Sequence, residues 1–317
     1  MYEAYFGLRE RPFGLTPNPR FVLVTPTHRE ALANLEYALT SRQGVTLLIG
    51  EAGTGKTTML RRALASHAEQ AGTIQHVHLS NPALTRSEFL EALANGFGLS
   101  EAAARSKTRL LRELEQTLRH RRELGAMSAL IVDESQSLPD ELLEEIRLLA
   151  NIESDTEKLL PIVLAGQPEL SERLNQWHLR QLKQRVTLRC ALEPLMLQET
   201  AAYIAGRVRL AAGDPGRLFA REAIIAVFER SRGIPRTIGV LCDNALLTAF
   251  ALDRPQVTAD LIDQVSSDFD LQRAETPVSS VTPGPDPATK LRAFDGGSPS
   301  TTWAMARRIS QHLRASR

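Results

Sequence analysis

Short apolar runs alternate with helical patterns along the first part of the chain. The runs cover residues 45–49, 74–79, 129–132, 160–165 and 186–192. Residues 57–71 and 139–150 between them carry apolar positions at helical spacing. Strands that alternate with helices in this way indicate a parallel sheet covered by helices on both faces. We therefore predict an α/β fold, with residues 74–79 at an edge or in a half-exposed position because His76 and His78 alternate with apolar neighbours.

Strand patterns disappear after Gln198, and only helical patterns follow. These patterns cover residues 199–210, 220–230, 236–251 and 259–269. Their apolar positions can share one small core, so we predict an all-helical second domain. Another helix is predicted before the first run, because Leu32, Leu35 and Leu39 follow the start signal at Thr25.

The C-terminal part of the chain has a different composition. Residues 275–300 are rich in Pro, Ser, Thr and Gly and cannot bury enough apolar surface to become ordered, so we predict a disordered linker. Residues 303–317 carry four arginines and no acidic residue. Their apolar residues lie on one helical stripe: Trp303, Ala306, Ile309 and Leu313. This short basic helix is either a frayed tail or a weak docking element for a partner or an anionic membrane surface.

Charge and cysteine usage narrow the classes of function. Lysine plus arginine (38) nearly balance aspartate plus glutamate (37), so the chain lacks the basic excess of a dedicated nucleic-acid coat. Cys190 and Cys242 lie in apolar patterns and are expected to be buried, reduced thiols, which suits a cytoplasmic protein. No signal peptide is evident, and no run approaches the roughly 18 apolar residues of a membrane span. We expect a cytoplasmic location with no transmembrane segment, or a peripheral one at the inner membrane.

A glycine-rich segment follows the first apolar run directly. The pattern G-x-x-x-x-G-K-[ST] is matched at every position by Gly50, Glu51, Ala52, Gly53, Thr54, Gly55, Lys56 and Thr57. Backbone N–H groups of such a loop point at a β-phosphate, and the following helix adds its positive N-terminal end. Lys56 can then neutralise phosphate oxygens, and the Thr57 hydroxyl can bind Mg²⁺. The sequence predicts an ATP and Mg²⁺ site here that extends to Thr58.

Polar residues end two of the later runs. Asp133 and Glu134 follow residues 129–132, and the carboxyl ends of parallel strands meet at the edge where the phosphate loop lies. Asp133 is thus placed to hold Mg²⁺, and Glu134 to polarise the attacking water. Gln167 follows Gly166 and can contact the γ-phosphate or the water. Alternatively, its amide satisfies the turn before the next helix.

Arginines supply the remaining candidates. A basic cluster precedes and enters the last run: Arg180, Lys183, Arg185 and Arg189. Most residues of such a cluster typically lie on a solvated surface between a helix and a strand. Arg185, directly before the run, is our candidate for an arginine that reaches a neighbouring subunit's γ-phosphate, with Arg180 in reserve. Arg236 follows Pro235 at a helix start, where its direction is fixed toward the nucleotide.

These motifs together resemble those of the AAA+ ATPases: GEAGTGKT, LIVDES, LAGQPEL, the LRQLKQRV arginines and GIPR. The segments YFGLRERPFGLTPNPRF and TPTHREAL further resemble the ExeA/GspA-type (general secretion pathway protein A-like) ATPases, which are related to TniB/TnsC-like transposition ATPases. The resemblance covers residues 5–269. It implies Walker A roles for Lys56 and Thr57 and Walker B roles for Asp133 and Glu134. It also implies sensor 1 at Gln167, the arginine finger at Arg185 and sensor 2 at Arg236.

The resemblance implies a P-loop AAA+ five-stranded parallel sheet, a small helical lid domain, and a homo-oligomeric ring or filament with ATP at subunit interfaces. Secretion members often continue into a membrane span and a peptidoglycan-binding module; with a linker and basic helix instead, direct peptidoglycan binding is not expected. The expected divisions are an N-terminal lead and helix (1–44), a nucleotide-binding domain (45–196), the lid (197–272), a linker (273–302) and a basic helix (303–317).

Three functions are compatible with these features. The first is Mg-dependent ATP hydrolysis that drives or regulates assembly of a cell-envelope machine for secretion or exopolysaccharide. The second is a DNA-binding, transposition-type regulator. Its candidate phosphate contacts, for which a solvated helix face is the favoured explanation, are Arg61, Arg62, Arg119, His120, Arg121 and Arg122. The third is a nucleotide-gated scaffold that hardly hydrolyses ATP, against which the presence of Glu134 argues.

Overall fold

The computed structural model describes residues 1–14, 25–41, 44–71, 74–80, 84–154, 157–269 and 271. The predicted linker at 273–302 and the predicted basic helix at 303–317 lie outside these described residues.

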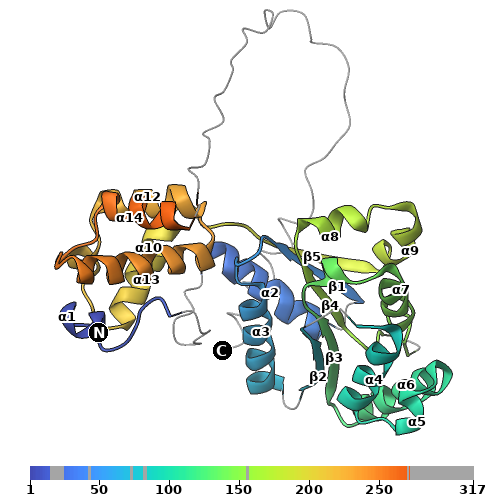
Figure 1. Cartoon of the computed structure of the whole chain (residues 1–317). Coiled ribbons are helices and arrows are strands. Elements are labelled where there is room, and N and C mark those ends of the chain that lie inside the picture. Colours follow the sequence, from blue (N-terminus) through green and yellow to red (C-terminus); the bar gives the residue numbers. More distant parts are fainter. Residues whose placement is uncertain are drawn as a thin grey trace, which may run out of the picture. The chain divides into compact units, whose positions relative to one another are not determined.

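A five-stranded parallel sheet lies at the centre of the first part of the chain (Figure 1). Its strand order is β2-β3-β4-β1-β5, so the predicted parallel sheet is confirmed and β2 lies at an edge, as its histidines indicated. The strands are β1 (Val45–Gly50), β2 (Ile74–Leu79), β3 (Met127–Val132), β4 (Ile162–Gly166) and β5 (Val186–Leu192).

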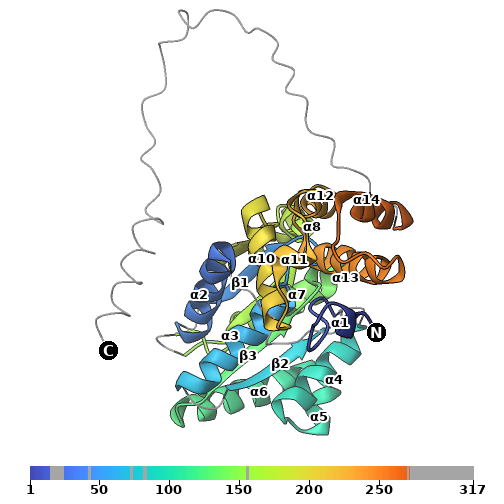
Figure 2. The ribbon, with the colours of Figure 1, turned by 90° about the vertical axis from the view of Figure 1, so that its left-hand side faces the viewer.

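The two faces of the sheet bury alternate side chains against different helices (Figures 1 and 2). Leu47 lies in one apolar cluster and its neighbour Leu48 in the other, as the two-residue repeat of a strand requires. The Leu48 cluster includes α2 (Pro26–Thr40) and α3 (Lys56–Ala71). The Leu47 cluster includes residues of α4 (Arg86–Phe97), α5 (Glu101–Ala104), α6 (Lys107–Glu123), α7 (Asp140–Leu149), α8 (Pro168–Arg173) and α9 (Arg180–Lys183).

Local signals set the ends of these helices. Thr85 and Glu88 form a capping box at the start of α4, which satisfies backbone N–H groups that have no partner within the helix. Gly98 ends the same helix at φ 69°, a left-handed conformation that glycine adopts without steric cost. Thr25 caps α2 by accepting from the backbone N–H of His28.

A second apolar core is built mainly from helices, as predicted. Ile204, Leu241 and Ile262 are among its fully buried residues. The helices are α10 (Leu197–Leu210), α11 (Pro215–Leu218), α12 (Arg221–Ser231), α13 (Pro235–Ala251) and α14 (Ala259–Asp268).

The N-terminal residues join this helical core. Tyr2, in α1 (Tyr2–Tyr5), is buried there with Leu8 and Phe13, and its hydroxyl donates to Asp243. The predicted division at residues 1–44 therefore combines two parts of the structure. Helix α2 packs on the sheet, whereas the first thirteen residues contact the helical core. The exact domain limits stay a prediction.

Both cysteines are free and buried, as expected from their apolar surroundings. Burial raises the pKa of the Cys190 thiol to about 12 and also raises that of Cys242. Among the residues that the structure describes, no helix is long and apolar enough to cross a membrane.

Candidate active site

The phosphate loop joins β1 to α3 and depends on its glycines. Gly53 and Gly55 have φ angles of 83° and 103°, which L-residues with a Cβ rarely adopt. A Cβ added to Gly53 would also lie 2.8 Å from the Cβ of Arg236. The loop therefore turns tightly, as an anion-binding turn requires, and no side chain at these glycines covers its backbone. It lies directly before the N-terminus of helix α3.

Lys56 lies over this loop with only 5% of its surface exposed. Its Nζ donates to the carbonyls of Gly50 (2.8 Å) and Glu51 (3.1 Å). Burial lowers the pKa of Lys56, and the nearby carboxylates of Glu134 and Asp133 oppose that shift. Phosphate oxygens are stronger acceptors than carbonyls, so this buried ammonium is well placed to bind them.

A hydroxyl and a carboxylate meet beside the loop. The Thr57 Oγ1 donates to Asp133 Oδ2 at 2.5 Å. Asp133 is 4% exposed and its backbone N–H donates to Leu79 on the neighbouring strand (2.9 Å), which fixes its position at the sheet edge. Hydroxyl and carboxylate oxygens are ligands that Mg²⁺ accepts, together with phosphates and water. Among the residues that the structure describes, no group of three or more His, Cys, Asp or Glu side chains could hold a metal ion.

Glu134 has a left-handed backbone with φ 51°, which is unfavourable for a residue other than glycine. The turn around it is held by Ser135, whose hydroxyl donates to the carbonyl of Val132 (2.8 Å), and by the N–H of Ser137, which donates to Glu134 (2.9 Å). Strain of this kind persists only where surrounding contacts impose it and is frequent at functional sites.

Gln136, which sequence reasoning missed, connects Glu134 to the next strand. Its Nε2 donates to Glu134 Oε2 (2.6 Å), and its Oε1 accepts from the backbone N–H of Gln167 (3.1 Å). Arg173 in turn donates to the Gln136 carbonyl (2.6 Å) and to that of Leu138 (2.8 Å). The signal in the sequence was the position of this polar side chain, two residues after Glu134. The amide fixes the orientation of the Glu134 carboxylate.

Replacing Gln136 with glutamate tests this orientation. The variant keeps the shape of the side chain but loses the donor and places two carboxylates together, so Glu134 must turn away. We expect ATP turnover to fall about 10- to 100-fold while ATP binding is retained. Steady-state phosphate release and equilibrium binding of ATP would measure the two effects. Unchanged turnover would show that Gln136 does not set the position of Glu134.

Two other predicted site residues are Gln167, which directly follows β4, and Arg236, which contacts the phosphate loop. Gln167 follows β4 as predicted, and its side chain makes no capping bond to α8, so the structure gives no support to the turn-capping alternative. The backbone N–H of Arg236 donates to the carbonyl of Gly53 (3.3 Å), which attaches the start of α13 to the loop. The catalytic roles of both residues stay predictions.

Arg185 lies at the opposite end of the strands from the phosphate loop. It precedes Val186, which pairs with Val45 at the start of β1, whereas the phosphate loop follows the end of β1. This strand has six residues, so at about 3.3 Å per residue its ends are roughly 16 Å apart. Arg185 lines a surface pocket of about 510 Å³ with Arg147, Arg180, Gln181 and Gln184. The strand length therefore separates Arg185 from the phosphate loop of its own chain.

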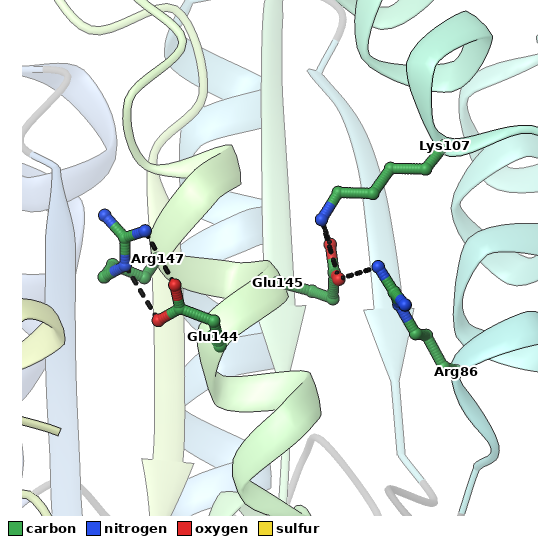
Figure 3. Close-up of polar contacts among 5 residues, drawn as sticks. All are labelled: Arg86, Lys107, Glu144, Glu145 and Arg147. Atoms are coloured by element: carbon green, nitrogen blue, oxygen red, sulfur yellow. Dashed lines mark hydrogen bonds and ion pairs between the residues drawn. The ribbon is translucent and has the colours of Figure 1, made fainter. Parts of the chain in front are cut away.

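Helix α7, which follows the strained turn, is anchored by a buried carboxylate (Figure 3). The Glu145 side chain is 8% exposed and forms ion pairs with Arg86 and Lys107, each at 2.8 Å. These two cations are the first residues of α4 and α6, where the helix dipole alone would disfavour them. On another side of α7, Arg147 is held by a double contact with Glu144 (Figure 3).

Replacing Glu145 with glutamine is expected to destabilise the chain by about 1–2 kcal/mol. The loss is moderate because Arg86 and Lys107 are 49% and 30% exposed and can be hydrated. The midpoint of thermal unfolding should fall by about 2–6 °C. Glu144→Gln is the matched control, since that carboxylate is 51% exposed, and it should change the midpoint little. Equal effects of the two changes would contradict the anchoring role.

The arginines proposed as DNA contacts have partners within the chain. Arg119 bonds to Glu115 (2.8 Å) and to the carbonyl of Glu153 (3.0 Å). Arg121 donates to the Ser128 hydroxyl (3.0 Å), and Arg122 pairs with Glu157. Arg61 and Arg62 are exposed on α3. Most of this basic group is thus already neutralised or hydrogen-bonded, which favours the solvated-face interpretation.

The sheet and the phosphate loop have the fold of a P-loop AAA+ domain, and residues 39–174 match the AAA domain family model. The chain is 41% identical over 252 residues to General secretion pathway protein A of Aeromonas hydrophila, covering 79% of this chain and 45% of that protein. It is 31% identical over 156 residues to the Mu-like prophage FluMu DNA transposition protein B of Haemophilus influenzae (49% of this chain, 48% of that protein). The predicted resemblance to the secretion-type and transposition-type ATPases is confirmed.

The chain spans about half the length of the curated relatives it matches. Among solved structures, the Aeropyrum pernix ORC2 protein (ADPNP-ADP complexes) superposes with a TM-score of 0.60 at 18% identity, over 84% of this chain and 73% of that one. At this identity the likeness shows the fold alone. The family match includes Lys56, Asp133, Glu134 and Gln167 but ends before Arg185.

Proposed function

We propose that this chain binds ATP and hydrolyses it with Mg²⁺ at the edge formed by the phosphate loop and the ends of β3 and β4. The observation that carries the proposal is the 2.5 Å contact between Thr57 and Asp133, directly beside the buried Lys56. A hydroxyl, a carboxylate and an ammonium at one helix N-terminus are the groups that phosphoryl transfer requires.

Each residue has a definite task in this proposal. Lys56 neutralises charge on the phosphate oxygens, while Thr57 and Asp133 are the residues that would hold Mg²⁺, which supplies further positive charge when bound. Glu134, oriented by Gln136, accepts the proton of the attacking water. Gln167 and Arg236 contact the γ-phosphate end of the nucleotide.

We further propose that the active site is completed by a neighbouring copy. The support is the position of Arg185 at the start of β5, where with Arg147 and Arg180 it lines a pocket at the opposite end of the strands from its own phosphate loop. An arginine from the adjacent copy can stabilise charge on the transferred phosphoryl group. Assembly into a homo-oligomeric ring or filament would then be a condition for hydrolysis.

The biological role that fits best is service to a cell-envelope machine. Similarity to General secretion pathway protein A over 79% of this chain supports it. We place the protein in the cytoplasm or at the inner-membrane surface, with residues 197–272 as a lid and residues 303–317 as a weak docking helix. Deletion of residues 301–317 should then weaken binding to anionic vesicles or to the partner.

Phosphate release from ATP tests the central proposal. The full chain should release phosphate with Mg²⁺ and none with EDTA, and the rate per chain should rise with protein concentration as copies assemble. Sedimentation in the presence of ATP or ADP should show larger species with ATP. The Lys56→Ala variant gives the background. Absence of Mg-dependent release at every protein concentration would overturn the proposal.

A DNA-binding regulator is the second candidate, favoured by the similarity to a DNA transposition protein. Retention of duplex DNA that requires ATP and falls steeply with salt would select it, because phosphate contacts release counterions. Binding to envelope components without such retention would select the first role.

A further inference from the structure

His28 lies behind the phosphate loop and is 6% exposed. It is the third residue of α2, and the cap residue of that helix, Thr25, lies three positions before it. Its Nδ1 lies 2.7 Å from the Thr25 hydroxyl oxygen, and its Nε2 lies 3.3 Å from the carbonyl oxygen of Thr54. The imidazole therefore connects the start of a helix with the centre of the loop.

The partners determine which ring nitrogen carries the proton. A carbonyl oxygen only accepts, so Nε2 must be the donor to Thr54. Burial lowers the pKa of His28 and favours the neutral ring, in which Nδ1 is then the acceptor. The Thr25 hydroxyl donates to Nδ1 and still accepts from the backbone N–H of His28 (3.3 Å). Both ring nitrogens are satisfied in a single arrangement.

This arrangement fixes one peptide plane of the loop. The Thr54–Gly55 peptide is trans, so the carbonyl of Thr54 and the N–H of Gly55 point in opposite directions. Gly55, at φ 103°, has no Cβ to restrict its backbone, so the plane depends on hydrogen bonds. The Thr54 N–H and hydroxyl are held by the Glu51 carbonyl, and, within the described part of the chain, the contact with His28 is the one made to the Thr54 carbonyl itself. A carbonyl held toward His28 keeps the Gly55 N–H pointing away from His28.

We propose that His28 is a positioning residue that aims the Gly55 N–H at the β-phosphate of the bound nucleotide. The inference rests on the proposed ATP site and adds to it a residue outside the phosphate-loop motif. The competing interpretation is that the His28 ring only fills space and holds the hydroxyl of the cap residue Thr25 in place. The two differ in which atom of the side chain matters: the donor at Nε2, or the bulk of the ring.

Two amide variants separate these interpretations. In His28→Gln the amide nitrogen can occupy the place of Nε2 and still donate to Thr54. In His28→Asn the shorter amide can reach only the place of Nδ1, next to Thr25, and the donor to Thr54 is lost. We expect His28→Asn to weaken ADP and ATP binding about 10-fold or more, and His28→Gln to remain within about 3-fold of the unchanged chain.

Calorimetric titration of the full chain with Mg-ADP measures the affinities, and thermal unfolding without nucleotide checks that each variant is folded. Should His28→Asn fail to fold, Thr25→Val replaces it, since loss of the Thr25 donor frees the ring to change tautomer and should also weaken ADP binding. If the unchanged chain binds Mg-ADP and the affinity does not fall in His28→Asn or Thr25→Val, this inference is overturned while the proposed function stands. Equal losses in the Gln and Asn variants would assign His28 to packing. No binding by the unchanged chain would overturn the proposed function itself.

Discussion

Replacing Glu134 with glutamine should lower ATP turnover by at least about 100-fold while ATP remains bound. Glutamine has the same shape but cannot accept the proton of the attacking water. Binding is retained because Lys56, Thr57 and Asp133 are unchanged. Single-turnover phosphate release and ATP retention after gel filtration measure the two properties. If our proposal of assembly is right, the variant should also accumulate as the ATP-bound oligomer.

Glu141→Gln is the matched control for this change, because Glu141 is an exposed carboxylate in the first turn of α7. It should leave turnover and binding as they are. Normal turnover in Glu134→Gln would sink the assignment of Glu134 as the base. Loss of ATP binding together with turnover would instead indicate that the strained turn at φ 51° had collapsed.

Replacing Arg185 with alanine should lower turnover by about 1,000-fold, the scale expected for an arginine finger. ATP binding to the same chain should be retained, because Arg185 lies at the opposite end of the strands from its own phosphate loop. Mixing provides the decisive measurement. Arg185→Ala retains Glu134, and Glu134→Gln retains the arginine, so mixed assemblies should recover turnover that neither variant has alone.

Arg189→Ala is the control for the arginine cluster. Arg189 lies within β5 and donates to the Ser171 hydroxyl (2.8 Å), so its loss should not affect turnover. Failure of every mixture of the two inactive variants to regain turnover would rule out a trans role for Arg185. Loss of turnover in Arg180→Ala with normal turnover in Arg185→Ala would transfer the role to the reserve candidate.

The strands and the phosphate loop could be predicted because each is a local pattern. The placement of Lys56 follows from the spacing of glycines, and the placement of Asp133 and Glu134 from an apolar run that ends in acids. The edge position of β2 was indicated by His76 and His78. In these cases, the physical reason for the structure lies within a few neighbouring residues.

Contacts between distant segments could not be predicted in this way. Gln136 is adjacent to Glu134 in sequence, but its role depends on the N–H of Gln167, which arrives from the next strand. The bond from Tyr2 to Asp243 joins residues 241 positions apart, so no periodicity could assign the N-terminal residues to the helical core. The side of the sheet on which Arg185 lies became clear only from the pairing of β5 with β1.

The phosphate loop and Arg185 lie at opposite ends of the strands of one sheet, so the two sides of an assembly contact differ in every copy. If each site takes its arginine from the next copy, contacts are head-to-tail, and closure depends only on the rotation between copies. In a closed ring every site is complete. In an open filament the subunit at one end always has a site without an arginine, so short filaments would hydrolyse less ATP per chain than long ones. The rate of hydrolysis would then report the length of the assembly.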